Sequence, residues 1–374
     1  MTNQEITEKF LSALRKYLSG DIMIDEAVEE SGLKSRKQFQ FRIKSAYAHN
    51  LIIVRRRIDP EKGTKVREWI YRSRGIAKGM EVFVIPDIPD DETFFSAVAE
   101  KFLGFLKELL SREDKEEINI GIVSGTGAAD TVKYVVKEGF WQEIMGGTKF
   151  KGTTKQGKEK SINIVAICST NLDGWELDGN ANISTLLLAR MLKENLPAFE
   201  VTPHGISTEL VVFEDASKQV DDRPSNKIIL QIVDPKRADP NSKDKSKLDI
   251  LIAGVGSSKD SKNVLKKVID QEMNVKVPEK VVGDVGFWAI DKDGNIVEIR
   301  DDEHRKLQVY SLITPEIMRE LAAGGGIVML IARNHRHDET VSKTIPIRAA
   351  IRGGYGNVIF TDEDTANELI KEPL

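Results

Sequence analysis

Residues 248–258 read LDILIAGVGSS, an apolar run followed directly by two glycines and two serines. A short apolar run bounded by small and polar residues predicts a β-strand over Leu248–Ala253, with a loop at its carboxyl end. In open α/β sheets, ligands bind beyond the carboxyl ends of the strands. This stretch therefore predicts one strand of the fold and one wall of a binding site.

Strands and helices alternate on both sides of this run, from Ile118 onward. The predicted strands are Ile118–Val123, Ile162–Cys168, Ile228–Val233, Leu248–Ala253, Phe287–Ile290, Ile327–Ile331 and Asn357–Phe360. The predicted helices are Ala129–Glu138, Ile183–Asn195, Lys262–Glu272, Thr314–Ala323 and Ile345–Arg352. Such alternation predicts an α/β domain with a largely parallel, Rossmann-like sheet.

Two loops after predicted strands are rich in glycine and hydroxyl residues. Small residues let a backbone approach an anion closely, and amides at a helix N-terminus bind phosphate. The candidates for anion binding are Ser124, Gly125, Thr126, Gly127, Gly254, Gly256 and Ser257. The alternative is a pair of tight turns without a ligand. Asp130 stands where a dinucleotide fingerprint would have its third glycine, and a Walker lysine is absent.

Two further residues have the chemistry of a sugar-phosphate site. Asp284, after Gly283, is a natural acceptor for sugar hydroxyls, although Gly-Asp pairs are also plain turn residues. Lys343 precedes a predicted helix and is a candidate phosphate cation. Together with the glycine loops, they predict a polar site built from several loops.

Catalytic and metal chemistry find little support in the sequence. A G-x-S-x-G elbow is absent, and Cys168 ends an apolar strand, so we expect a buried thiol. His204 lies in a predicted loop without an assigned partner. A polar run contains metal-ligand residue types that we expect to be solvated: His335, His337, Asp338 and Glu339. We therefore predict no catalytic residue, no metal and no cofactor.

The charge of the chain is concentrated in one segment. Residues 33–78 contain 14 Lys and Arg against three Asp and Glu, a net charge of +11 in a chain whose total is −4. Residues 79–374 have a net charge of −11. A basic block beside an acidic remainder is typical of a polyanion-binding module. The alternative is a solvated basic face.

The basic segment has the pattern of a winged helix-turn-helix. Apolar spacing predicts helices over Glu5–Leu18 and Ile24–Ser31, and a third helix after an N-cap at Ser35. Residues 51–58 and 66–72 are predicted as two strands joined by a turn, the wing. The candidate DNA contacts are Arg36, Lys37, Gln38, Gln40, Lys44, Arg55, Arg57 and Lys65. Side chains of these types read base edges and hold phosphates in double-stranded DNA.

The chain is predicted to have three parts. Residues 1–78 form the DNA-binding domain, residues 79–117 a proline-containing linker with an amphipathic helix over Glu92–Leu110, and residues 118–374 the effector-binding domain. The longest apolar run is too short to cross a membrane, and the N-terminus lacks the pattern of a signal peptide. With a single cysteine, these features predict a cytoplasmic protein without a membrane partner.

The order of these parts resembles the SorC family of bacterial sugar-binding transcriptional regulators. The resemblance rests on Ala349–Gly354 (AAIRGG), Asn357–Ala366 (NVIFTDEDTA), Asp249–Gly256 (DILIAGVG) and Val281–Asp284 (VVGD), the last followed by Asp291–Gly294 (DKDG). It covers most of residues 118–370 and, more loosely, residues 1–58. The first glycine loop lacks the tryptophan and arginine common in relatives, and residues 331–334 replace the family's Gly-Gly-x-x-Lys segment.

The resemblance implies an effector domain akin to glucosamine-6-phosphate deaminase and ribose-5-phosphate isomerase. The loops at 124–127 and 254–257, Asp284 and Lys343 would then surround a phosphorylated sugar. The resulting prediction is a DNA-binding transcriptional regulator, a homodimer or homotetramer, whose operator binding responds to that effector. The alternatives are a sugar-phosphate isomerase or deaminase with a DNA-binding arm, and an interaction platform without a ligand.

Overall fold

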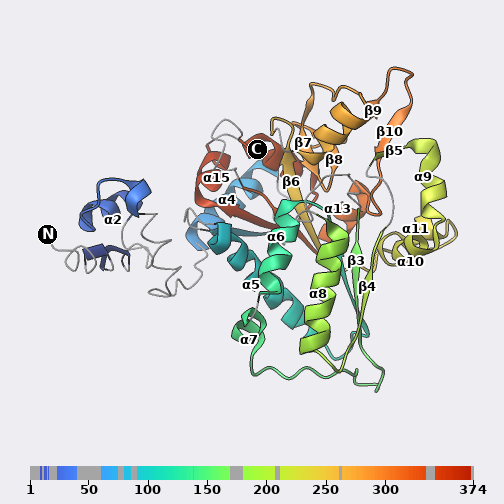
Figure 1. Ribbon diagram of the computed structural model, residues 1–374, viewed down its shortest axis with the longest axis horizontal. Helices are drawn as coiled ribbons and strands as arrows, with labels where there is room; N and C mark the ends of the chain where they lie inside the picture. Colours follow the sequence, from blue (N-terminus) through green and yellow to red (C-terminus); the bar gives the residue numbers. More distant parts are fainter. Residues whose placement is uncertain are drawn as a thin grey trace.

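A nine-stranded sheet forms the centre of the protein in a computed structural model (Figure 1). The structure describes residues 9–10, 12–14, 16, 23–39, 60–74, 80–85, 91–137, 139–168, 180–206, 211–260, 263–333 and 342–371. The strands are β1 (Glu81–Ile85), β2 (Glu117–Ile122), β3 (Ser161–Ala166), β4 (Glu200–His204), β6 (Ile250–Ser257), β7 (Val281–Val285), β8 (Trp288–Asp291), β11 (Ile327–Ile331) and β12 (Val358–Asp362).

Seven strands run parallel in the order β1-β12-β11-β6-β2-β3-β4. The end of β6 continues past the others and pairs antiparallel with β7, which pairs in turn with β8. A separate three-stranded sheet joins β5 (Val211–Phe213), β10 (Lys306–Val309) and β9 (Ile299–Arg300). The largely parallel sheet predicted from the sequence is confirmed.

Helices cover the sheet, with α5, α6 and α8 forming one layer (Figure 1). A second group of contacting helices is α4, α14 and α15. The helices are α2 (Ile24–Glu30), α4 (Pro60–Arg74), α5 (Asp91–Ser111), α6 (Thr126–Val135), α7 (Phe140–Met145), α8 (Ala181–Asn195), α9 (Glu214–Asp221), α10 (Pro224–Val233), α11 (Pro235–Ala238), α12 (Val264–Lys267) continuing as a π-helix over Val268–Glu272, α13 (Pro315–Ala323), α14 (Thr344–Gly353) and α15 (Glu363–Leu369). The helix predicted over Glu92–Leu110 corresponds to α5. Among the described residues, none of these helices has the length and hydropathy needed to span a bilayer.

The predicted wing is wrong in its second strand, because residues 66–72 belong to helix α4. Val66 and Ile70, four residues apart, are buried in the core and define a helical face. A β-carbon on Gly63 would lie 2.5 Å from the carbonyl oxygen of Val82, so α4 packs closely on β1. Residues 51–58, predicted as the first strand, lie outside the described residues.

A second strand prediction, Ile228–Val233, is also wrong. This segment is the end of α10, which begins with Pro224 at its first position. Asn226, Ile229, Leu230 and Val233 are its buried residues, and their spacing is that of a helix rather than a strand. The apolar run IILQIV is ambiguous by itself, and the proline at N1 favours the helix.

The described N-terminal residues include parts of two of the predicted helices. Residues 24–30 form α2, and residues 36–39 are helical after Ser35, whose hydroxyl accepts the N–H of Gln38 at 3.3 Å. Phe39 is fully buried and contacts Phe10 edge to face, with ring centroids 5.3 Å apart. This small core leaves Arg36, Lys37 and Gln38 exposed.

Candidate functional site

The loop after β2 exposes the beginning of α6. Gly125 caps the helix with a φ of +134°, a conformation that favours glycine, and provides no side-chain acceptor. Acidic residues are absent from the first turn of α6, and Thr126 is exposed. The first-turn N–H groups therefore retain the partial positive charge of a helix N-terminus.

Ser124 holds this loop to the neighbouring strand and helix. Its hydroxyl donates to the carbonyl oxygen of Cys168 at 3.0 Å and accepts the N–H of Ala181 at 3.1 Å. Its own N–H lies 3.3 Å from the Cys168 sulfur. The hydroxyl proton of Ser124 is thus committed to structure, and the ligand-facing part of the loop is Gly125–Gly127.

Cys168 is buried, as predicted. Burial raises the pKa of the Cys168 thiol to about 12, and the charge of Asp284 acts in the same direction. The thiol is therefore protonated at neutral pH and is a poor nucleophile.

Asp284 and Asn263 form a buried pair over Gly256. The amide of Asn263 donates to Oδ1 of Asp284 at 2.6 Å, and the two residues are 9% and 6% exposed. A β-carbon on Gly256 would lie 2.1 Å from that oxygen, so only glycine fits beneath the pair. A β-carbon on Gly254 would meet no atom of the described residues within 4 Å, which leaves the backbone there open to a ligand.

Lys343 and Arg333 bring positive charge to the same place. Burial raises the pKa of Asp284, while the Asn263 amide and Lys343 lower it. Burial lowers the pKa of Lys343, and the charges of Asp260 and Asp284 act in the opposite direction. The site thus contains two carboxylates and two cations whose charges interact, with the Arg333 guanidinium 4.6 Å from the ring centroid of Phe94.

The glycine loop and the charged group meet at one edge of the sheet. A β-carbon on Gly127 would lie 3.2 Å from Cγ2 of Ile331, at the carboxyl end of β11. Arg333 follows two residues later. The structure therefore brings residues 124–127, residues 254–257, Asp284 and Lys343 together. The prediction that residues 254–257 and Asp284 lie in loops is wrong, because they belong to β6 and β7. The structure also adds Asp260, Asn263 and Arg333, which the sequence analysis did not assign to a ligand. Their position in loops after adjacent strands is the signal that could have identified them.

His204 forms a hydrogen bond with a residue of β3. Its Nε2 lies 3.2 Å from Oδ1 of Asn163, whose amide donates to Asn119 at 2.9 Å. Burial lowers the pKa of His204. Within the part of the chain that the structure describes, no cluster of potential metal ligands is found, and residues 335–339 lie outside it.

The predicted DNA contacts are only partly described. Arg36 is exposed and forms a bidentate ion pair with Asp25 at 2.5 and 2.6 Å, whereas Lys37 and Gln38 are exposed beside it. Lys65 lies on α4 and pairs with Glu61 at 2.7 Å, so its predicted place in a β-hairpin is wrong. The remaining candidates, Gln40, Lys44, Arg55 and Arg57, lie outside the described residues.

The fold is an α/β domain with a mostly parallel sheet, and in such sheets ligands bind beyond the carboxyl ends of the strands. Among solved structures, the chain is similar to the full-length sorbitol operon regulator SorC from Klebsiella pneumoniae, with a TM-score of 0.58 and 17% identity over 97% of this chain and 98% of that chain. It is also similar to a sor operon regulator from Shigella flexneri (TM-score 0.53, 17% identity, 83% and 98% covered). A third similar structure is a SorC family regulator from Enterococcus faecalis (TM-score 0.52, 14% identity, 83% and 100% covered).

No protein-family model and no curated protein sequence matches the chain. The structural likenesses confirm the resemblance to SorC-type regulators at the level of the fold.

Proposed function

We propose that this protein is a cytoplasmic transcriptional regulator that binds an operator as a homo-oligomer and responds to a small phosphorylated sugar. The observation that carries the proposal is the likeness to the sorbitol operon regulator over 97% of this chain, so that it reaches beyond the α/β domain. The basic block at residues 33–78 and the exposed start of the third helix supply the chemistry that DNA requires.

The proposed effector lies between the start of α6 and the buried charged group. The first-turn amides of α6 and the cations Arg333 and Lys343 suit a phosphate. Asp284, fixed by Asn263, suits sugar hydroxyls as an acceptor. The open backbone at Gly254 leaves room for the ligand between them.

Helix α14 offers a route from this site to α4. Lys343 is the N-cap of α14, and five residues later Arg348 lies over the ring of Trp69 in α4, 5.9 Å from its centroid. Arg348 also donates to the carbonyl oxygens of Glu368 and Leu369 at 3.1 Å, which joins α14 to α15. Lys62 of α4 pairs with Glu363 of α15. A ligand that shifts Lys343 would thus move helices packed against α4, which follows the N-terminal helices in the chain and packs on β1 of the sheet.

Selection of operators from a random DNA library with the full-length protein tests the regulatory proposal. We expect enrichment of a palindrome, with affinity falling as salt rises. Lys37→Ala should weaken binding, whereas Lys193→Ala, which removes the same charge from an exposed position of α8, should not. Binding that depends on salt but not on sequence would refute the proposal.

The coupling through α14 has its own test. Trp69→Ala should keep operator affinity and sugar-phosphate affinity but abolish the change in one caused by the other, because allostery is a coupling free energy between sites. Glu61→Gln, an exposed change on the same helix, should leave the coupling intact. A full ligand response in Trp69→Ala would contradict this route.

One observation favours a second candidate, a sugar-phosphate isomerase or deaminase. A buried carboxyl with a raised pKa beside a lysine is the kind of group that general acid–base catalysis uses. Turnover of ribose 5-phosphate or glucosamine 6-phosphate that Asp284→Asn abolishes would establish this activity. We propose binding without turnover, since the thiol of Cys168 is protonated and His204 is bonded to Asn163.

A further inference from the structure

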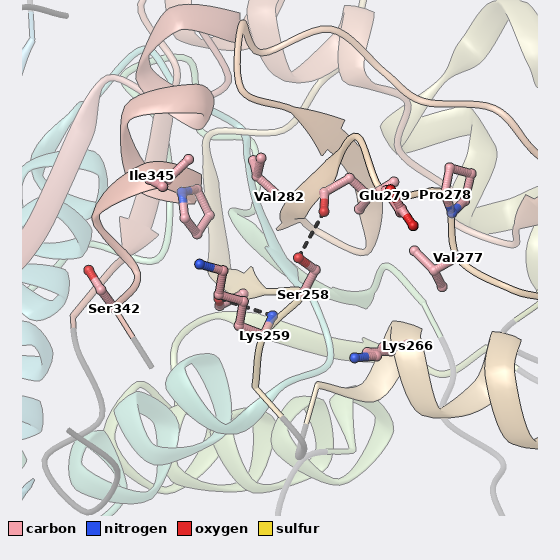
Figure 2. Close-up of a pocket in the computed structure, with 12 residues that line it drawn as sticks. Ser258, Lys259, Lys266, Val277, Pro278, Glu279, Val282, Ser342 and Ile345 are labelled. Carbon is pink, nitrogen blue, oxygen red and sulfur yellow. Dashed lines mark hydrogen bonds between the residues drawn. The ribbon is translucent and has the colours of Figure 1, made fainter. Parts of the chain in front are cut away.

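A cavity of about 360 Å³ lies beside the other face of the β6–β7 pair. Gly256 and Asp284 are register partners, so their side-chain positions share one face; Ser257 and Gly283 are partners on the opposite face. There a β-carbon on Gly283 would lie 2.7 Å from Cβ of Pro346 in α14. Ser257 and Pro346 both line the cavity, which therefore lies beside the face of the β6–β7 pair opposite Asp284. Figure 2 shows the residues that line it.

One wall of the cavity is apolar. It is formed by Val277, Pro278 and Val282 on one side and Ile345 on the other. Ile345 is 46% exposed, unusually accessible for an isoleucine in the first turn of a helix. An apolar body resting on this wall would remove that surface from water.

The rest of the cavity is positive in a domain whose net charge is negative. Lys259 and Lys266 line it, and among the described residues neither ammonium has a carboxylate within ion-pair distance. Figure 2 shows the Lys259 ammonium directed toward the beginning of α14 and Lys266 below Ser258. The carboxylate at the rim, Glu279, is 92% exposed and pairs with Lys276 at 3.8 Å.

A helix terminus borders the cavity. Ile345 and Pro346 belong to the first turn of α14, a helix of ten residues, and line the cavity. Pro346 has no N–H, the N–H of Thr344 bonds to the Ser342 hydroxyl at 3.2 Å, and the Thr344 hydroxyl donates to the Glu368 carboxylate at 2.6 Å, so this turn offers a ligand the amide of Ile345. The hydroxyl of Ser258 donates to the carbonyl oxygen of Val281 at 2.8 Å, so its proton is committed to structure and it offers a phosphate no donor. The cavity thus combines two lysines that have no carboxylate partner among the described residues with an apolar wall, in a volume typical of small-molecule sites.

We propose that this cavity is a second ligand site, which takes a small organic phosphate with an apolar body. The phosphate lies between Lys259, Lys266 and the first turn of α14. The apolar body rests on Val277, Pro278 and Ile345. The site is distinct from the proposed sugar-phosphate site, because it lies beside the opposite face of the β6–β7 pair.

Calorimetric titration of the full-length protein with phenyl phosphate, in buffer without phosphate, tests the proposal. We expect saturable binding that is several-fold tighter than that of inorganic phosphate. Lys266→Met should weaken it about tenfold, the usual worth of a charge-assisted hydrogen bond, and a double variant with Lys259→Met should weaken it further. Lys280→Met, which removes an exposed charge beside the cavity without lining it, should change affinity less than about twofold.

Variants of the other face separate the two sites. Arg333→Met should weaken sugar-phosphate binding and leave the affinity for phenyl phosphate unchanged. Unaltered phenyl phosphate binding in the double lysine variant would overturn the proposal, as would the absence of binding at millimolar concentration. Loss of phenyl phosphate binding in Arg333→Met would also overturn it, since the ligand would then occupy the sugar-phosphate site.

Discussion

Replacing Gly256 with alanine tests the geometry of the candidate site directly. The added β-carbon would lie 2.1 Å from Oδ1 of Asp284 and 2.6 Å from Nδ2 of Asn263. Both atoms belong to buried side chains joined at 2.6 Å, so relief requires that this hydrogen bond break or that β7 move away from β6. Overpacking of this kind costs about 1–3 kcal/mol.

Gly254 provides the matched control two residues away in the same strand. Neither glycine has a positive φ, so both alanine variants restrict the unfolded chain equally. At Gly254 the new methyl group meets no atom of the described residues within 4 Å. We therefore expect Gly254→Ala to be as stable as the parent protein or more so, by up to about 1 kcal/mol, while Gly256→Ala is less stable.

Urea unfolding followed by tryptophan fluorescence measures this difference, since the chain has four tryptophans. The midpoint should fall for Gly256→Ala without a change in slope, and rise slightly or stay constant for Gly254→Ala. Equal midpoints for the two variants would refute the reasoning, because they would show that Asp284 and Asn263 do not lie over Gly256.

Three further predictions concern charge and burial. Lys343→Met should destabilise the protein more at pH 7 than at pH 5. Without the lysine, the raised pKa of Asp284 rises further, and a carboxyl whose pKa is raised in the folded state lowers the protein's stability as the pH increases through that pKa. Urea unfolding at the two pH values measures this difference. Arg237→Met should cost about 3–5 kcal/mol in urea unfolding, because it leaves Asp221, 15% exposed and bonded to Arg237 at 2.6 Å, without its cation. Cys168 should resist iodoacetamide at pH 8 in the native protein and react in urea, as mass spectrometry will show.

The controls for these predictions use exposed groups. Arg190→Met breaks an ion pair with Glu194 whose side chains are 81% and 61% exposed, and it should leave the urea midpoint unchanged. An equal loss of stability in Arg190→Met and Arg237→Met would contradict the role of burial. A pH-independent effect of Lys343→Met would show that this lysine does not act on Asp284, and rapid native alkylation would place Cys168 outside the core.

The sequence predicts five of the seven parallel strands, β2, β3, β6, β11 and β12, because short apolar runs between glycine loops have few other structures to adopt. It misses β1, which lies in the predicted linker, and β4, where His204 was expected in a loop. The prediction fails where an apolar run fits both the two-residue period of a strand and the 3.6-residue period of a helix. IILQIV in α10 is apolar enough for a strand, and its helical form depends on Pro224 and on packing of Ile229 and Val233 into the core. Apolar and polar residues alternate enough in residues 66–72 to suggest a strand. However, Val66 and Ile70 pack against β1, and this tertiary contact favours the helix.

The sequence predicts which segments form the candidate site, but not the hydrogen bonds and charge interactions within it. Gly256 and Asp284 stand out in the sequence as separate loop residues; that one lies beneath the other follows only from the antiparallel pairing of β7 with the end of β6. Asn263 lies 21 residues before Asp284 in the sequence, and in the folded protein its amide donates a hydrogen bond to the Asp284 carboxylate. Arg333 and Lys343 are separated by ten residues, yet the charge of Arg333 lowers the pKa of Lys343, which the charges of Asp260 and Asp284 raise. A ligand site built from loops of adjacent strands thus depends on strand order, and strand order is set by the whole sheet rather than by any one motif.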